Sequence, residues 1–306
     1  MATTVTAPVT NSIALAQRYL PMLDELYKAN SRTAILDTVS ERVSFVGASA
    51  VNIYNVDPVG MGNYSRNAGY VPGDVDGTWA TYTLNTDRGR SYMVDALDNE
   101  ESMGMAFGGL LSEVERQWIV PEVDAFRFAS FAAGASSATQ ASAAISSGSA
   151  AIAAIDAATV ALDNQEVPYE GRILFVSPSM YGYIKAGVTR MVMNRDDNVN
   201  YNVAMYNDMQ VITVPQTRFV TAIDLAAPTA ASAAGGYTKA STAKDINFMI
   251  IHPTAVLQVM KHYVPRIFSP AVNQEADAYK LNIRFAHGAW VLTHKSNGIY
   301  LHTSTT

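Results

Sequence analysis

The sequence predicts an α+β fold, because segments with helical periodicity alternate with segments of strand composition and no regular βαβ repeat is present. The 306 residues are 49% hydrophobic and only 16% charged, whereas a typical soluble domain has about 25% charged residues. The low charge indicates that something other than water covers much of the surface. The net charge of −6 argues against a dedicated nucleic-acid binder, and the lack of cysteine excludes disulfides and Cys-ligated zinc.

The first residues predict an arm that carries a helix. Ser12 can cap this helix, apolar residues recur at helical spacing as far as Tyr27, and Pro21 predicts a kink or a division into two short helices. The start of the chain has no basic segment followed by an apolar one, so it does not match a secretory signal. The uncharged stretch from Ala129 to Ile155 is too rich in small residues to enter a bilayer, and a flexible or weakly helical segment is expected there.

A long β-hairpin is expected between Val43 and Val94. Val51 and Ile53 alternate with their neighbours, and residues 79–84 are rich in aromatic and β-branched types, as strands prefer. The residues between them, 57–77, are dense in Gly, Pro, Asn and Asp, which predicts an elaborate tip. Because a two-stranded hairpin is only marginally stable in water, this one needs a partner surface.

The longest helical pattern follows the hairpin. It begins at Asp98, Asn99 and Glu101, where acidic groups suit the helix dipole, and Pro121 inside the pattern predicts one long kinked helix. The expected apolar stripe comprises Met103, Phe107, Leu110, Val114 and Trp118. The expected polar face comprises Glu113, Glu115 and Arg116.

The rest of the chain alternates between the two kinds of element. Helices are expected over residues 150–162, 178–185 and 254–262. Strands are expected over residues 172–176, 209–214 and 246–251, and a strand-rich region over 264–301. Loops are expected over residues 196–202 and, as a flexible low-complexity segment, 228–243.

No catalytic, cofactor-binding or metal-binding constellation emerges from the sequence. Ser241 and Lys244 match the SxxK pattern of acyl-serine hydrolases, but its companion motifs are missing. A loop that begins at Asp196 starts like a calcium site, but Tyr201 stands where that motif requires glycine. Glu101 and its neighbour are explained by the helix dipole. The histidines have no metal-ligand spacing, and core or interface imidazoles are the better interpretation: His252, His262, His287, His294 and His302.

Several stretches, taken in order, resemble the major capsid protein of tailed bacteriophages, which has the Hong Kong-97-type fold. LDELYKANSRTAIL (23–36) looks like the N-terminal arm of one branch of that family. Residues 70–102 look like the outgoing strand of its extended loop running into the spine helix, and residues 120–132 like the second half of that helix. HPTAVLQVMKHYVPRIFSP and AHGAWVLTHKSNGIYLH resemble its C-terminal return.

The resemblance implies a domain organisation. Residues 1–39 would form an N-terminal arm and 40–95 an extended β-hairpin loop, both lying over neighbouring subunits. Residues 96–139 and 252–306 would form a peripheral domain with the spine helix, and 140–251 an axial domain. The chain would assemble as pentamers and hexamers into the icosahedral head of a virion, in the cytoplasm of the host bacterium.

The resemblance also implies partners. They are a portal, packaged double-stranded DNA held without sequence specificity, and a decoration protein; no membrane is involved. Because the matched arm begins almost at Met1, a separate scaffolding protein is expected. Some family members weld neighbouring subunits through a lysine of the extended loop, whereas this chain has no lysine between Lys28 and Lys185.

Six residues are candidates for contacts between subunits: Arg66, Trp79, Tyr82, Arg88, Arg90 and Glu101. Their roles are hypotheses, because the arginines also suit a solvated turn and Trp79 also suits packing within its own subunit. Three other classes of protein stay open. They are a nanocompartment shell of the encapsulin type with the same fold, a tail or adhesion protein, and an enzyme whose site is assembled from scattered residues such as the late histidines.

Overall fold

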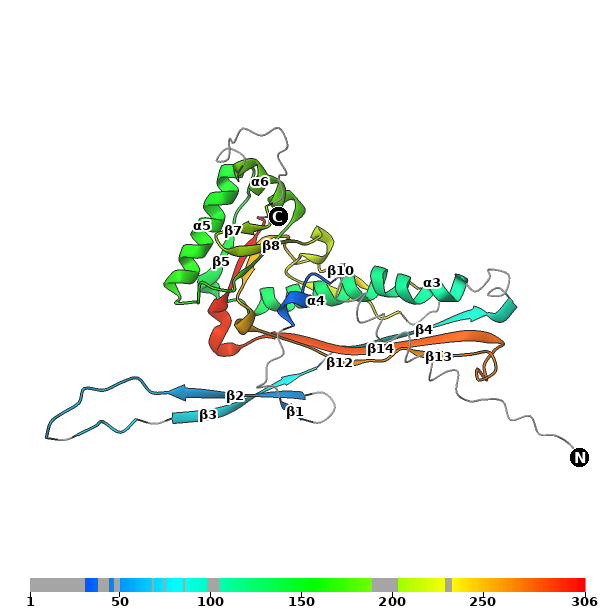
Figure 1. The fold of residues 1–306 in the computed structure, drawn as a ribbon, viewed down its shortest axis with the longest axis horizontal. Helices are drawn as coiled ribbons and strands as arrows, with labels where there is room; N and C mark the ends of the chain where they lie inside the picture. The colour runs from blue at the N-terminus through cyan, green and yellow to red at the C-terminus, as the bar shows by residue number, and fades with distance from the viewer. Residues whose placement is uncertain are drawn as a thin grey trace, which may run out of the picture.

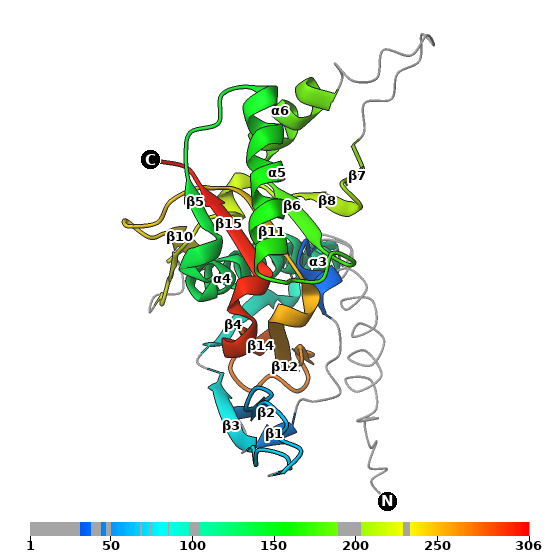
Figure 2. The same ribbon diagram turned by 90° about the vertical axis from the view of Figure 1, so that its left-hand side faces the viewer.

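The computed structural model describes residues 31–37, 44–46, 50–67, 69–73, 75–84, 86–97, 105–188, 203–228 and 233–305. The described elements lie in three layers, shown from top to bottom in Figure 1 and in the turned view of Figure 2. A compact α/β part lies at the top, a long helix over a long sheet lies in the middle, and a β-hairpin lies below. The mixture of helices and mainly antiparallel strands confirms the predicted α+β class.

The lowest layer is the predicted hairpin. β2 (Ala50–Pro58) pairs antiparallel with β3 (Val75–Thr83) in continuous register, from Ala50↔Thr83 to Pro58↔Val75. The short β1 (Ser44–Val46) adds to β2. We call residues 50–83 the hairpin and residues 59–74 its tip. Near its base, Val51 and Ile53 pack with Leu257, which fixes the hairpin to the layer above.

The middle layer is built on one long helix, which we call the spine helix. It consists of α3 (Met105–Val114), a π-helical turn (Glu115–Ile119) and α4 (Val120–Gly134), with Pro121 at the start of α4. The predicted continuation of the helix through Pro121 is confirmed, and the predicted kink there stays a prediction. The predicted start at Asp98–Glu101 lies outside the described residues.

The π-helical turn corrects the predicted faces of this helix. A π turn contains more residues per turn than an α-helix, so it rotates the residues within it relative to the preceding stripe. Ile119, Val120 and Val123 are buried against the sheet, whereas Trp118 is 44% exposed although it was predicted on the apolar stripe. Glu115, predicted on the polar face, is fully buried. The sequence pattern assumed an unbroken α-helical period, and this assumption was wrong here.

A long antiparallel sheet lies under the spine helix. Its central strand is β14 (Ala278–Val291), which pairs on one side with β4 (Thr86–Asp95) and on the other with β12 (Val256–Tyr263) and β13 (Arg266–Phe268). The strand that leaves the hairpin thus enters a different sheet at Thr86, so the segment predicted as one extended loop (40–95) is shared between two sheets.

The helix predicted over residues 254–262 is wrong, because this segment is mainly β12. The error has a physical cause. Val256 packs in one core, Leu257 in the hairpin cluster and Met260 against the spine helix. A strand that is covered on both faces carries apolar residues at every spacing, including helical ones, so periodicity alone does not identify it.

The top layer contains a six-stranded sheet with two helices. Its strand order is β5 (Gln140–Ser142), β15 (Ile299–Thr303), β11 (Ile246–Ile251), β6 (Ile173–Val176), β8 (Met209–Thr213), β7 (Met205–Tyr206). α5 (Gly148–Asn164) and α6 (Pro178–Val188) cover one face, and α4 packs on the other. These elements confirm the predicted strands at 172–176, 209–214 and 246–251 and the helices at 150–162 and 178–185.

Two details of this layer differ from the sequence prediction. The Ala/Ser stretch is ordered, with β5 and the start of α5 inside it. β10 (Tyr237–Lys239) lies within the predicted loop 228–243 and pairs with β9 (Ile223–Leu225). β15, near the end of the chain, also belongs to the six-stranded sheet. The predicted arm helix at 12–27 and the loop at 196–202 lie outside the described residues.

A buried carboxylate ties residues 31–37 to the spine helix. Asp124 on α4 is fully buried, and its Oδ1 accepts hydrogen bonds from the hydroxyls of Ser31 and Thr33, both at 2.7 Å. Its Oδ2 accepts one from the backbone N–H of Arg32 at 2.9 Å, and Arg218 approaches this oxygen at 3.4 Å. Because a buried carboxylate is costly unless it is paired and hydrogen-bonded, this cluster fixes where the arm meets the body.

We expect Asp124→Ala to destabilise the subunit by about 3–5 kcal/mol, because it leaves several buried donors and Arg218 without their acceptor. Urea denaturation measures this change, and limited proteolysis should cut first near residues 31–37. The control is Glu113→Ala, which removes the exposed ion pair with Arg116 and should leave the unfolding midpoint unchanged. Equal midpoints for the two variants would contradict the prediction.

A neutral imidazole is sealed between the spine helix and the sheet. His287 on β14 is fully buried between Phe126, with ring centroids 4.8 Å apart, and Phe285, at 5.6 Å. Among the described residues neither of its ring nitrogens has a hydrogen-bond partner. Burial, helped by the nearby positive charges of Arg127 and Arg88, lowers the pKa of His287 to about 3.

Acid should therefore destabilise the fold through His287. Below pH 6.5 the unfolded chain protonates this ring while the folded chain keeps it neutral, so the group lowers the free energy of unfolding as pH falls towards 3. The expected contribution is about 1.4 kcal/mol per pH unit. It is measured as the difference in pH dependence between wild type and His287→Leu in urea denaturation. The exposed His294→Leu control should keep the wild-type dependence, and wild-type dependence in His287→Leu would sink the idea.

Candidate assembly surface

The hairpin carries an unusual share of the exposed apolar side chains. Seven of the large apolar residues that are exposed in the described part of the chain lie between positions 54 and 79: Tyr54, Val59, Met61, Tyr64, Tyr70, Val71 and Trp79. Met61 at the tip is fully exposed, and Trp79 is 60% exposed. Contiguous exposed apolar surface of this kind marks interaction sites on soluble proteins.

Tyr54 and Trp79 form an aromatic pair on the exposed face of the hairpin. They lie directly opposite each other in the β2–β3 register, and their ring centroids are 5.0 Å apart. The Tyr54 ring extends over Gly77, where any side chain would collide with the tyrosine hydroxyl. Gly77 therefore makes room for the pair. Trp79 was predicted as a contact residue, and the structure places it where a partner can reach it.

The tip has a second aromatic pair. Tyr64 and Tyr70 lie with ring centroids 4.9 Å apart, above a tight turn in which Ser65 and Gly69 exchange two backbone hydrogen bonds. Gly69 has a φ of 79°, a conformation that favours glycine. The predicted contact residue Arg66 is exposed within this turn. The aromatic pairs, unlike Trp79 alone, were not singled out from the sequence; the signal was the cross-strand spacing of the aromatic residues.

Tyr82 points towards its own subunit. Its ring lies 5.7 Å from that of Trp290 on β14, and it packs with the cluster that holds the base of the hairpin. Tyr82 is thus a residue that positions the hairpin. Glu101 lies outside the described residues.

Arg88 and Arg90 make contacts within their own chain. Arg88 Nε lies 2.7 Å from Oε1 of the buried Glu122, and its Nη1 donates to the carbonyl of Ala226 at 2.6 Å. Arg90 Nη2 donates to the carbonyl of Ala233 at 3.0 Å. The two arginines therefore hold the loop after β9 against the sheet. Their contact with a neighbouring subunit stays a prediction.

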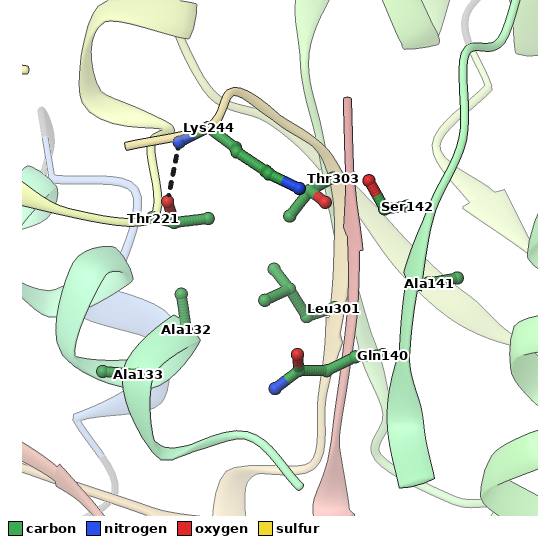
Figure 3. Close-up of a pocket in the computed structure, with 9 residues that line it drawn as sticks. All are labelled: Ala132, Ala133, Gln140, Ala141, Ser142, Thr221, Lys244, Leu301 and Thr303. Atoms are coloured by element: carbon green, nitrogen blue, oxygen red, sulfur yellow. Dashed lines mark hydrogen bonds between the residues drawn. The ribbon is translucent and has the colours of Figure 1, made fainter. Parts of the chain in front are cut away.

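A pocket of about 370 Å³ opens between the end of α4 and the edge of the top sheet (Figure 3). The Lys244 side chain extends across it towards Thr303 and Ser142, and the Lys244 backbone N–H donates to the Thr221 hydroxyl at 2.8 Å. Ser241 does not line this pocket, so the SxxK pattern receives no support as a catalytic pair. Its nine lining residues are Ala132, Ala133, Gln140, Ala141, Ser142, Thr221, Lys244, Leu301 and Thr303.

The other sequence candidates form no reactive centre in the described residues. His252, His287 and His302 are buried, and burial lowers the pKa of each. His302 Nδ1 lies 3.1 Å from the amide nitrogen of Asn247, so it is a satisfied core imidazole. Within the described ranges, no group of three or more His, Asp or Glu side chains is placed to hold a metal ion. No helix in that part of the chain is both long and apolar enough to cross a bilayer.

Comparison with known proteins gives no match at the level of sequence and a clear match at the level of structure. No family model matches the chain, and no curated protein matches it. The capsid structure of the cyanophage P-SCSP1u contains a similar chain, with 12% identity, coverage of 86% of this chain and 85% of that chain, and a TM-score of 0.58. The mature capsid of bacteriophage PhiM1 is similar at 14% identity, with coverage of 85% and 83% and a TM-score of 0.58.

A virus-like particle from Pyrococcus furiosus is also similar, with 8% identity, coverage of 93% of this chain and 99% of that chain, and a TM-score of 0.51. These likenesses span most of each chain, so they concern the whole architecture and not one shared motif. The hairpin, the spine helix with its sheet and the compact α/β part therefore together form the Hong Kong-97-type α+β fold of phage capsid shells.

Proposed function

We propose that this chain is the major capsid protein of a tailed phage, which assembles with its own copies into the icosahedral head around double-stranded DNA. The observation that carries the proposal is the hairpin. In the described residues the cluster that fixes it to the body lies near its base, and it exposes two preformed aromatic pairs. Exposed apolar side chains on a projecting hairpin favour aggregation of a lone monomer, whereas in a shell they are buried against neighbouring subunits. The shared fold with phage capsid structures supports the same conclusion.

The domain organisation inferred from the resemblance fits this function. Residues 1–39 would be the arm, 40–95 the extended loop, 96–139 with 252–306 the peripheral domain, and 140–251 the axial domain at the five-fold and six-fold positions. Trp79, Arg66, Arg88, Arg90, Glu101 and Tyr82 remain the proposed contact residues. Among them Trp79 and Arg66 are supported by exposure on the hairpin.

The remaining partners follow from the same proposal. The net charge of −6 suits a shell that encloses DNA without gripping it, because packaging requires the duplex to slide. A separate scaffolding protein, a portal and a decoration protein would complete the particle in the host cytoplasm. In this proposal the role of the chain is structural.

A nanocompartment shell that holds a protein cargo is the second candidate. The likeness to the virus-like particle from Pyrococcus furiosus favours it. The two candidates differ in their contents, since one shell takes up DNA with a portal and the other takes up an enzyme.

The test is expression of the chain alone and together with its neighbouring genes, followed by negative-stain microscopy. We expect closed icosahedral shells, because many modest contacts that close by symmetry give a stable particle. Analysis of particles from infected cells should find double-stranded DNA inside. A compact monomer under all conditions would refute the proposal, and an enzyme cargo in place of DNA would favour the nanocompartment.

Replacing the tip (residues 59–74) by a two-residue Asn-Gly turn should abolish stable shells while the subunit stays folded. The tip lies beyond the strands that pack on the body, so its removal should leave circular dichroism and the melting temperature near wild type. The matched control exchanges only Tyr64 and Tyr70 for serine and keeps the loop length. A tip deletion that unfolds the subunit would show that the tip is part of the core.

Mature particles should be held together without covalent links between subunits. The hairpin contains no lysine, and arginine cannot replace its amine because the guanidinium stays protonated. Boiling particles in detergent should therefore release one band near 32.9 kDa. A ladder of oligomers that survives boiling would overturn this expectation.

A further inference from the structure

The long sheet edges of this subunit differ in how they are protected. An unpaired strand edge is a template for pairing with another chain, and soluble proteins protect it with charge, proline or short length. In the part of the chain that the structure describes, β5 and β7 are edge strands of only three and two residues. The outer edge of β4 has Asp87, Arg88, Arg90 and Asp95 along its ten residues.

Most of the outer edge of β3 has no such protection. Within the described residues β3 is nine residues long and pairs with β2 alone. β3 carries one charged residue near its start, Asp76, and from Gly77 to Thr83 it has no charge and no proline. The partner strand β2, by contrast, ends with Asp57 and Pro58, and β1 covers its start. Among the described outer edges β12 (Val256–Tyr263) is also long and carries Lys261 near its end, whereas β3 has the longer run without charge or proline, from Gly77 to Thr83.

We propose that the free edge of β3 pairs through main-chain hydrogen bonds with a strand from a second copy of this chain. The inference rests on the proposed shell function and specifies how one of its contacts is made. Strand addition to an exposed edge is a recurrent mode of recognition. Since every second N–H of β3 points away from β2, the second copy would satisfy donors that face solvent in the single subunit.

Three observations favour a second copy as the occupant. Like charges that lie opposite each other across strands destabilise a sheet, and the uncharged part of the β3 edge, from Gly77 to Thr83, brings no such repulsion between identical chains. The same strand carries Trp79, 60% exposed and paired with Tyr54, so the proposed edge is continuous with the exposed apolar face of the hairpin. The hairpin also projects away from the body in Figure 1, so its edge is open to a neighbour.

A charge placed on the edge provides the first measurement. Thr81 is exposed in the middle of β3. Thr81→Lys therefore adds a charged side chain that disfavours edge pairing, as the charges on β4 do, without removing a core side chain. We expect this variant to melt like wild type and to raise the protein concentration needed for assembly at least tenfold. The matched control, Ser91→Lys, places the same charge at an exposed position of the guarded strand β4 and should assemble as wild type does.

Hydrogen exchange on the wild-type protein provides the second measurement and needs no variant. In free subunits about half of the amides of residues 76–84 should exchange slowly, namely those bonded to β2. In purified shells nearly all of them should be slow. Shells whose β3 amides exchange as in free subunits, together with normal assembly of Thr81→Lys, would overturn the edge proposal and leave the shell function standing.

The remaining outcomes also decide the matter. Protection that appears only when a scaffolding or decoration protein is added would replace the second copy by that protein as the occupant. A chain that forms no shells under any condition would overturn the shell function and, with it, the edge pairing. If Thr81→Lys fails to fold, the exchange comparison on wild type still shows whether the β3 edge is paired in shells.

Discussion

The structure depends on the packing of α4 against β14, because both elements take part in the core of the middle layer and in the core that joins the spine helix to the top sheet. Val120 and Val123 of α4 pack with Leu281 and Phe285 of β14 in the middle layer. Further along, Phe128 and Phe131 of α4 share the top-layer core with Ala289 of β14. Trp290 of β14 then meets the base of the hairpin. We call this contact between α4 and β14 the seam. Because all three layers are attached to it, the contacts at the seam also set the direction of the hairpin relative to the compact α/β part.

Polar groups inside the seam fix its alignment more strictly than apolar packing does. Asp124 must meet the hydroxyls of Ser31 and Thr33, and Arg88 must meet Glu122. A slip of one residue along the helix would leave these buried charges unpaired, at a cost of several kcal/mol. Apolar surfaces, in contrast, tolerate such slips with little loss of buried area. The charges therefore select one arrangement of helix, sheet and arm segment among several that would bury similar area.

The sequence predicted those elements whose structure is determined by residues close together in the chain. Turn residues at 57–77 and alternating residues around Val51 gave the hairpin, and uninterrupted apolar runs gave the buried strands of the top sheet. β12 was missed because partners distant in sequence cover both of its faces. The exposure of Trp118 was missed because a π turn leaves no periodic trace. Arg88 finds Glu122 only through the fold, so its place in the candidate site was beyond the reach of residue patterns.

The shallow anchoring of the hairpin has a consequence for the accuracy of assembly. The cluster that attaches the hairpin to the body contains Val51, Ile53 and Tyr82, near the hairpin base. The nine-residue strands extend beyond these residues. Fixing the hairpin against a neighbouring subunit costs conformational entropy, which lowers the binding free energy of each contact. Weak contacts dissociate quickly, so a subunit that joins at a wrong angle leaves before others enclose it. Reversible contacts at the hairpin would thus let misplaced subunits leave, and stability would appear only when the shell closes.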